Sequence, residues 1–210
     1  MRIPKKGWAL IKIIIFLLSL SPFLLLVNAT LQDRLGANPI QELHFSLGDW
    51  ALRFLCISLA LTSLKKTLKQ SWPVRFRRMI GLYAFFYATM HLTVYIVLDL
   101  SLSWEALIDE VPKSPYILLG IFTYLLLIPL AFTSTKAMQK YLGKRWIQLH
   151  RLVYVANISA VIHYLWLVKS DISDPLLYAS IIFILLSARI FSYLKRKSAS
   201  SKRPHNIVKT

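Results

Sequence analysis

Long apolar runs alternate with short polar segments along most of the chain. Each run approaches the roughly 20 residues that a helix needs to cross the hydrocarbon core of a bilayer. The connecting segments carry prolines or charge clusters, such as "KKTLKQSWP" and "KAMQKYLGKR". The pattern predicts an all-α, polytopic membrane protein with six transmembrane helices in a bundle, at Trp8–Val27, Phe45–Leu64, Met79–Leu100, Tyr116–Phe132, Leu149–Val168 and Leu176–Tyr193.

The composition agrees with a lipid bilayer as the surrounding solvent. The chain is 56% hydrophobic and its mean hydropathy is +0.54, more apolar than a typical soluble domain. A single cysteine, Cys56, excludes a disulfide framework and a cysteine-rich metal site. The first apolar run lacks a suitably placed small-residue cleavage motif, so we expect it to be a helix and not a removed signal peptide.

Charged residues predict the orientation of the six helices. Lys and Arg cluster at the N-terminus, between the second and third runs, between the fourth and fifth, and in the tail. The positive-inside rule places these clusters, and therefore both termini, in the cytoplasm. All nine acidic residues fall on the other side: Asp33, Glu42, Asp49, Asp99, Glu105, Asp109, Glu110, Asp171 and Asp174.

This distribution also accounts for the net charge of +17 without a nucleic-acid partner, since the cations lie in short clusters beside apolar runs. We expect residues 1–195 to form the membrane domain. Residues 196–210 are basic and polar, which predicts a disordered cytoplasmic tail.

Histidines mark the candidate chemistry. Counted at 1.5 Å per residue from the cytoplasmic end, His91 lies about 18 Å and His163 about 21 Å deep, whereas His150 lies at the cytoplasmic edge. An ionisable residue at membrane depth indicates a functional site, although for one isolated histidine a hydrogen bond to a neighbouring helix is the favoured interpretation. Three histidines need a joint test, which their depths supply. Two levels of imidazole are what a stack of two haems needs, because haem iron takes axial imidazoles from facing helices.

Helix geometry leaves this hypothesis open. His150 and His163 are thirteen residues apart, which at about 100° per residue offsets their rings by roughly 140°. A bend, or haems approached from different faces, would be required. A shared zinc or non-haem iron site is excluded, because the two histidines are too far apart and no carboxylate lies at the depth of His91.

Several blocks carry a resemblance to a known family. "RRMIGLYAFFYATMHLTVY", "LAFTSTKAMQKYLGKRWIQLHRLVY" and "IHYLW" resemble the MsrQ (formerly YedZ) family, and "RLGANPI" is similar to its first outer loop. The likeness runs from about residue 8 to residue 195. These proteins are haem-binding membrane subunits of the bacterial periplasmic methionine sulfoxide reductase system. More distantly, the chain is similar to the six-helix membrane domain of ferric reductases and NADPH oxidases.

The resemblance implies a multi-pass protein of the bacterial inner membrane that binds one or two b-type haems, with FMN as a further candidate cofactor. It implies the ligands His91, His150 and His163. It also implies electron delivery, as the non-catalytic subunit of a heterodimer, to a periplasmic molybdopterin-containing reductase. Quinone or a flavin reductase would be the donor. The superfamily pairs four histidines, and Arg77 stands where the fourth is expected; a guanidinium stays protonated and cannot ligate iron.

Other polar residues have two interpretations each. Arg53 can form a local ion pair with Asp49 at i, i+4, or hold a haem propionate. The cytoplasmic cations, including Arg77, are explained by attraction to the membrane surface, or by binding of haem propionates or a flavin phosphate. For His44, at the outer mouth of the second helix, we expect interfacial hydrogen bonding in place of ligation.

Two other functions remain open from the sequence. The chain could be a ferric-reductase-like enzyme that reduces a small acceptor directly, although it carries no fused nicotinamide-binding segment. It could also be a non-redox transporter or assembly factor whose histidines are buried between helices. The visible spectrum of the purified protein separates this last reading from the two redox functions.

Overall fold

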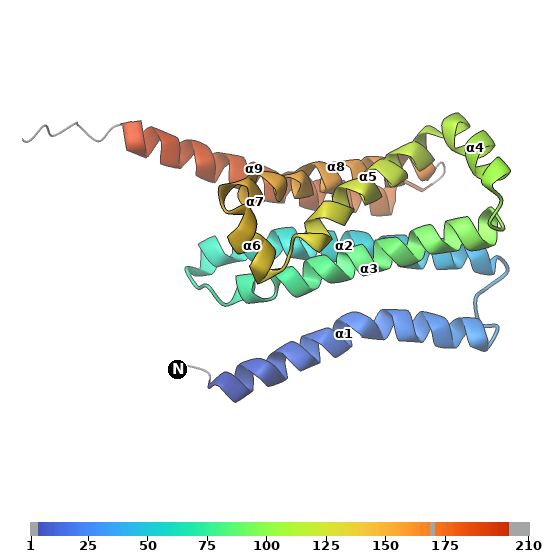
Figure 1. Cartoon of the computed structure of the whole chain (residues 1–210), viewed down its shortest axis with the longest axis horizontal. Coiled ribbons are helices and arrows are strands. Elements are labelled where there is room, and N and C mark those ends of the chain that lie inside the picture. Colours follow the sequence, from blue (N-terminus) through green and yellow to red (C-terminus); the bar gives the residue numbers. More distant parts are fainter. Residues whose placement is uncertain (1–3, 169–170, 202–210) are drawn as a thin grey trace, which may run out of the picture.

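The computed structural model describes residues 4–168 and 171–201, and the regular structure within these residues is helical (Figure 1). The long helices run roughly along a common axis, and short helices connect some of them. The elements are α1 (Lys5–Leu31), α2 (Pro39–Leu68), η1 (Pro73–Arg75), α3 (Arg77–Val94), η2 (Tyr95–Asp99), α4 (Trp104–Lys113), α5 (Pro115–Phe132), α6 (Lys136–Leu142), α7 (Lys144–Leu149), α8 (Leu152–Leu167) and α9 (Ser173–Ser201).

The predicted all-α membrane fold is confirmed. Five helical stretches are long and apolar enough to cross a membrane: Lys6–Leu31, Pro39–Lys65, Arg77–Asp99, Pro115–Phe132 and Ser173–Lys195. Helix α8 occupies the predicted fifth span, but its 16 residues make it shorter than these five. The count of six spans and the cytoplasmic termini therefore stay predictions. The two ends of the described chain lie at the same end of the bundle (Figure 1).

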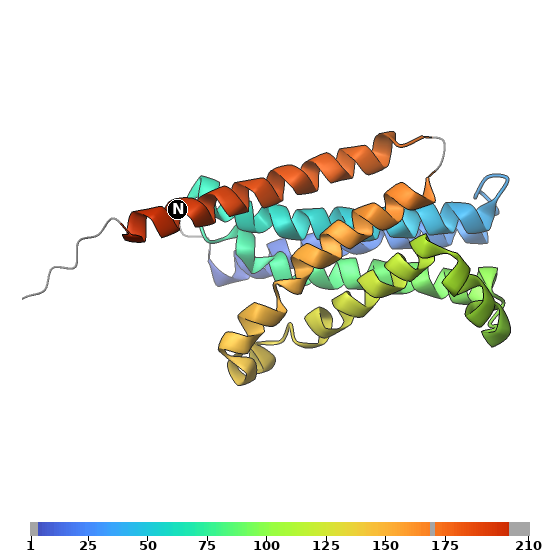
Figure 2. The same cartoon turned by 90° about the horizontal axis from the view of Figure 1, so that it is seen from above.

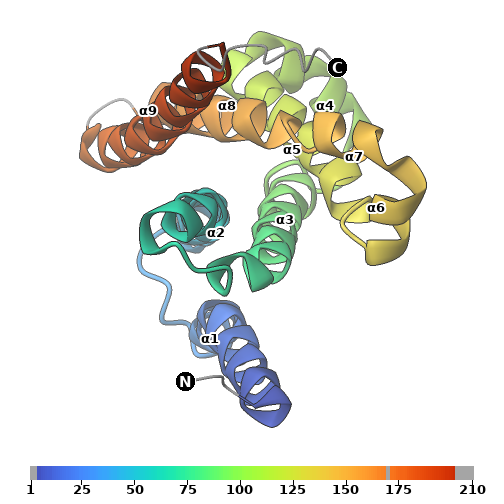
Figure 3. The same ribbon diagram turned by 90° about the vertical axis from the view of Figure 1, so that its left-hand side faces the viewer.

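Four helices surround the centre of the molecule. Viewed along the bundle, α2 and α3 form one side and α5 and α8 the other (Figure 3). Helix α9 packs against α2 and α8, and α1 lies outside against α2 and α3. Helix α4 and the α6–α7 pair lie at opposite ends of α5 (Figure 2). This arrangement leaves the space between the two helix pairs for the sites described below.

Tyrosines of α3 attach α1 to the bundle. The hydroxyl of Tyr87, which is fully buried, donates to the carbonyl of Ser19 (2.9 Å) and accepts from the N–H of Phe23 (3.0 Å). It is thereby inserted into a backbone hydrogen bond of α1, next to Pro22, a residue that itself interrupts the helical ladder. The hydroxyl of Tyr83 donates to the carbonyl of Phe16 (2.8 Å). In an apolar surrounding these bonds fix the position of α1.

The structure differs from the predicted boundaries at functionally important places. The predicted span Leu149–Val168 is interrupted at residues 150–151: α7 ends at Leu149 with His150 as its C-cap, and α8 begins at Leu152. The predicted helix 79–100 ends in a π-helical turn, η2. The outer segment after it contains helix α4. Helix α9 continues through Ser201, and the remainder of the predicted tail, residues 202–210, lies outside the described residues.

Candidate functional site

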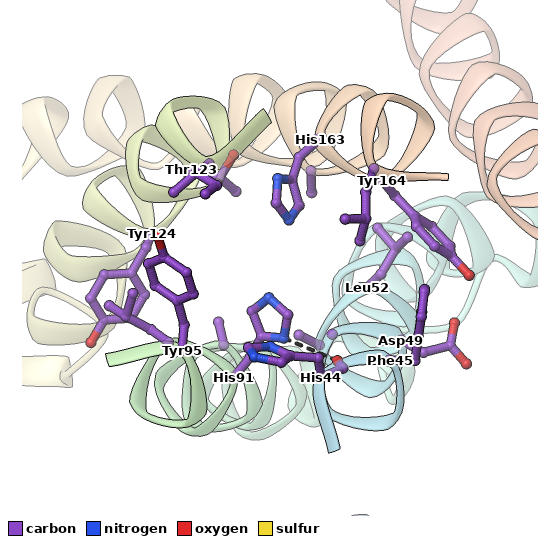
Figure 4. Close-up of a pocket in the computed structure, with 18 of the residues that line it drawn as sticks. His44, Phe45, Asp49, Leu52, His91, Tyr95, Thr123, Tyr124, His163 and Tyr164 are labelled. Carbon is purple, nitrogen blue, oxygen red and sulfur yellow. Dashed lines mark hydrogen bonds between the residues drawn. The ribbon is translucent and has the colours of Figure 1, made fainter. Parts of the chain in front are cut away.

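A cavity of about 660 Å³, named the outer cavity below, lies between α2, α3, α5 and α8 in the outer half of the predicted membrane domain. Its walls are mainly apolar side chains such as Leu52 and Leu127. His91 from α3 and His163 from α8 point into this space from opposite sides (Figure 4). The two histidines that the sequence placed at similar depth are therefore brought together, on helices that are far apart in the chain.

Backbone carbonyls hold both imidazoles. The Nδ1 atom of His91 lies 3.0 Å from the carbonyl oxygen of His44, and Nδ1 of His163 lies 2.7 Å from that of Tyr116. A carbonyl oxygen only accepts, so Nδ1 must be the protonated nitrogen in each ring. In a neutral imidazole that carries its proton on Nδ1, Nε2 keeps its lone pair, as metal-binding histidines require.

The spacing of the two rings fits a single metal ion between them. Their centroids are 6.3 Å apart and their planes are nearly perpendicular, at 83°. Two metal–nitrogen bonds of about 2 Å, plus about 1 Å from each nitrogen to its ring centre, add up to roughly 6 Å. The cavity thus presents two imidazoles at a spacing that suits one metal ion held between them.

His44 lies beside this pair and is bonded as an interfacial histidine. Its Nε2 is 2.5 Å from a carboxylate oxygen of Asp99, and its ring meets that of His91 edge-on at 5.1 Å. Asp99 is eight residues after His91, which in a regular α-helix would turn it about 80° away. The π-helical turn η2 adds residues to the turn, so that His91, Tyr95 and Asp99 all line the cavity.

A second cavity of about 370 Å³, named the inner cavity below, lies towards the basic end of the bundle. His150, Arg77 and Arg78 line it, together with Trp146 and Gln139. The ring of His150 stacks on Trp146 at 4.0 Å, and its Nδ1 is 3.2 Å from the Trp146 carbonyl oxygen. Arg77 and His150, two predicted site residues, are therefore brought to one inner cavity, separate from His91 and His163.

The two cavities are neighbours. Leu55 of α2 and Leu127 of α5 line both of them, and both side chains are almost fully buried, at 4% and 5% exposure. A further link is aromatic: Phe85 of the inner cavity stacks on Tyr124 of the outer one, with ring centroids 5.6 Å apart. A thin layer of apolar side chains thus separates the two sites.

Arg53 is not among the residues that line either cavity. It forms an ion pair with Asp49, donates from Nε to the Tyr178 hydroxyl at 3.0 Å, and lies 4.6 Å above the Trp50 ring. These contacts correspond to the local ion pair considered from the sequence. Binding of a haem propionate by Arg53 stays a prediction, and the cavity lining adds no support for it.

Sequence reasoning missed the carbonyl partners and the Asp99 contact of His44. Neither leaves a signal in the spacing of polar residues, because both depend on how α2 and α3, or α5 and α8, are rotated against each other. The histidines themselves were found because imidazole is rare at membrane depth.

Comparison with known proteins agrees with this geometry. Residues 47–161 match the family described as "Ferric reductase like transmembrane component". The chain is 47% identical over 171 residues to the "Protein-methionine-sulfoxide reductase heme-binding subunit MsrQ" of Xanthomonas euvesicatoria pv. vesicatoria, covering 81% of this chain and 78% of the relative. It is 43% identical over 195 residues to the protein of the same name from Herminiimonas arsenicoxydans, covering 91% and 89%. No solved structure gives a significant match. The chain belongs to the MsrQ family.

Proposed function

We propose that this protein is a haem-binding electron-transfer subunit that serves a periplasmic methionine sulfoxide reductase from the bacterial inner membrane. The observation that carries the proposal is the pair of imidazoles, His91 and His163, facing each other across an apolar cavity. The names of its relatives, which describe haem-binding subunits of a protein-methionine-sulfoxide reductase, supply the reaction it supports.

The outer cavity fits a b-type haem. The Nε2 atoms of His91 and His163 have free lone pairs, and the spacing of the two rings suits an iron between them. The lining is mainly apolar, as a porphyrin requires. When bound, the haem would supply one-electron redox chemistry. His91 and His163 would hold its iron, and the bound group would then carry electrons across this part of the bundle.

The inner cavity fits such a group less well. His150 offers one imidazole, and Arg77 cannot be the second ligand because its guanidinium stays protonated. Arg77 and Arg78 instead suit anionic groups, such as haem propionates or the phosphate of FMN. We propose that His150 and Arg77 hold an inner cofactor of this kind, which would make the protein a two-level conduit.

In this proposal electrons enter on the cytoplasmic side from quinone or a flavin reductase and leave on the periplasmic side. The acceptor is a molybdopterin-containing reductase that repairs oxidised methionines, bound to this subunit as a heterodimer. The outer cavity lies nearer the end of the bundle that carries the acidic residues of α4, and the inner cavity nearer the basic end.

The function is tested with the purified protein. We expect a Soret band, reduction of the haem by quinol or by reduced flavin under anaerobic conditions, and re-oxidation by the reductase subunit together with methionine sulfoxide. Comparing quinol with reduced flavin identifies the donor. A protein without a Soret band, or with a haem that the reductase subunit does not oxidise, would contradict the proposal.

Topology is part of the same proposal: six spans, α8 included, with both termini in the cytoplasm. The basic clusters and the position of both described ends at one end of the bundle support it. Alkaline phosphatase fused after Lys113 should be active and fused after Lys144 inactive. The reverse pattern would overturn the orientation.

A further inference from the structure

Each of the two facing histidines rests on a glycine of the neighbouring helix. A Cβ atom added to Gly48 of α2 would lie 3.2 Å from Cε1 and Nδ1 of His91. One added to Gly120 of α5 would lie 2.9 Å from Cε1 and 3.0 Å from Nδ1 of His163. Carbon atoms in favourable contact are about 3.5–4.0 Å apart. A larger residue at position 48 would therefore push the His91 ring away from α2, and one at position 120 would push the His163 ring away from α5.

The two contacts, each an imidazole packed on a glycine and called a seat below, share one geometry. In each, the imidazole Nδ1 donates to the carbonyl of the residue four positions before the glycine: His44 before Gly48, and Tyr116 before Gly120. Four residues are about one helical turn, so this carbonyl lies on the same helix face as the glycine. The same contact therefore occurs in two separate helix pairs, α2 with α3 and α5 with α8.

The repeat extends to the chain positions. His91 follows Gly48 by 43 residues, and His163 follows Gly120 by the same number. A glycine that only eased helix packing would meet whatever side chain lay opposite, whereas here both glycines meet the imidazoles that face the cavity. By contrast, a Cβ on Gly81 would meet only Ser58 Oγ, at an ordinary 3.8 Å.

We infer that Gly48 and Gly120 are positioning residues for the two imidazoles. The missing Cβ lets each ring approach the helix closely enough to bond its carbonyl, and this bond fixes the Nδ1–H tautomer and aims Nε2 into the cavity. The link to iron rests on the proposed function. The packing of each imidazole on its glycine can be tested without haem.

The first test substitutes the glycines in the haem-loaded protein. Gly120→Ala should convert outer haem from a six-coordinate low-spin state to a high-spin state and weaken haem binding roughly 10–100-fold, as loss of a ligand-orienting contact does. Gly48→Ala should do the same more weakly, because its seat is less tight. The readouts are the electron paramagnetic resonance spectrum, the midpoint potential and haem retention.

Gly81→Ala is the matched control for adding a methyl group to a helix of this bundle. Because Gly81 lines the inner cavity, this control is read only at the outer haem, whose low-spin signal should stay unchanged. Wild-type spectra and potentials in both Gly48→Ala and Gly120→Ala would overturn the inference. If His91→Ala and His163→Ala also keep the full haem spectrum, the proposed function fails instead.

The second test is a double-mutant cycle read by thermal unfolding. Gly120→Ala should lower the melting temperature when His163 is present. It should be neutral or stabilising in the His163→Ala background, because alanine is the better helix former once no ring is in its way. Equal shifts in melting temperature with and without His163 would overturn the inference that Gly120 positions this ring. Should Gly120→Ala alone not fold, recovery of folding in the double variant supports the inference and failure of both variants refutes it.

Discussion

The outer and inner cavities lie side by side in one helix bundle, yet they are equipped differently. The outer one has two imidazoles on opposite walls, each tied to a backbone carbonyl. The inner one has a single imidazole, His150, at a break between two helices, and two guanidinium groups, Arg77 and Arg78. The outer cavity presents two imidazoles that face each other across it, whereas the inner cavity presents positive charge on its lining.

This difference indicates different ligand chemistry at the two levels. Paired neutral imidazoles offer lone pairs to a metal from both sides, and an apolar lining excludes water from the space between them. Guanidinium groups on a cavity wall in a membrane protein are costly unless an anionic group pairs with them. The inner cavity therefore suits a ligand with acidic groups, held mainly through charge.

The largest effect is expected from the outer pair. His91→Ala and His163→Ala should cause the same loss of low-spin haem absorbance, close to complete for the outer haem, and the double variant should lose little more. In the proposed function, either change would remove one of two ligands to a single iron. Optical and paramagnetic resonance spectra of the purified variants measure this.

This contrast between the two cavities would be wrong if His163 paired with His150 and not with His91. An intact haem spectrum in His91→Ala, together with complete loss in both His150→Ala and His163→Ala, would show that His150 and His163 share one haem. That outcome would also require the layer formed by Leu55 and Leu127 to open.

A smaller effect is expected at the inner cavity. His150→Ala should remove a separate spectral component, or shift only its potential, while the low-spin signal assigned to His91 and His163 stays. If each cavity holds one haem, the absorbance per protein falls by about half. Redox titration followed at the Soret band distinguishes removal from a shift. A loss of the outer signal in this variant would contradict two independent sites.

The fold and the outer pair could largely be predicted because both follow from hydrophobic periodicity. Apolar runs located the long helices, and counting residues from the basic ends gave similar depths for His91 and His163. Depth depends on distance along one helix. It does not depend on how that helix is rotated against its neighbours.

Rotation and irregular turns explain what the sequence left open. The expected 140° offset between His150 and His163 assumed one straight helix, but the chain leaves the helix at residues 150–151. The nearest backbone signal, Gly143, lies seven residues before His150 and is the N-cap of α7. The contact of Asp99 with His44 depends on the π-helical turn η2, and such turns have no characteristic residue.

Arg77 tests the role of charge in the inner cavity. Arg77→Gln should lower the midpoint potential of an inner haem by several tens of millivolts, because a nearby positive charge favours the electron-rich reduced form. Arg77→Lys keeps the charge and should restore most of the potential while losing bidentate contacts. The outer potential should change much less, which redox titration of both centres checks. Equal shifts at the two levels would remove the assignment of Arg77 to the inner cavity.

The smallest effect is expected where electrons leave. Helix α4 begins at an N-cap formed by Ser103 and exposes Glu105, Asp109 and Glu110, with Asp109 paired to Lys113. If this helix helps to dock the reductase, the triple change Glu105→Gln, Asp109→Asn and Glu110→Gln should slow oxidation of the outer haem by roughly three- to tenfold, because attraction between opposite charges mainly raises the association rate.

The effect of the triple change on haem oxidation should fade at high salt, since screening already weakens the attraction in the wild type. Haem content and both potentials should stay as in the wild type, because none of the three side chains lines either cavity. Asp33→Asn with Glu42→Gln is the matched control: these acids are exposed near the α1–α2 connection, at the same predicted side of the membrane. Stopped-flow oxidation at several ionic strengths separates the cases. Unchanged kinetics in the α4 variant, or an equal slowing in the control, would mean that general surface charge, and not α4, guides the partner to the outer haem.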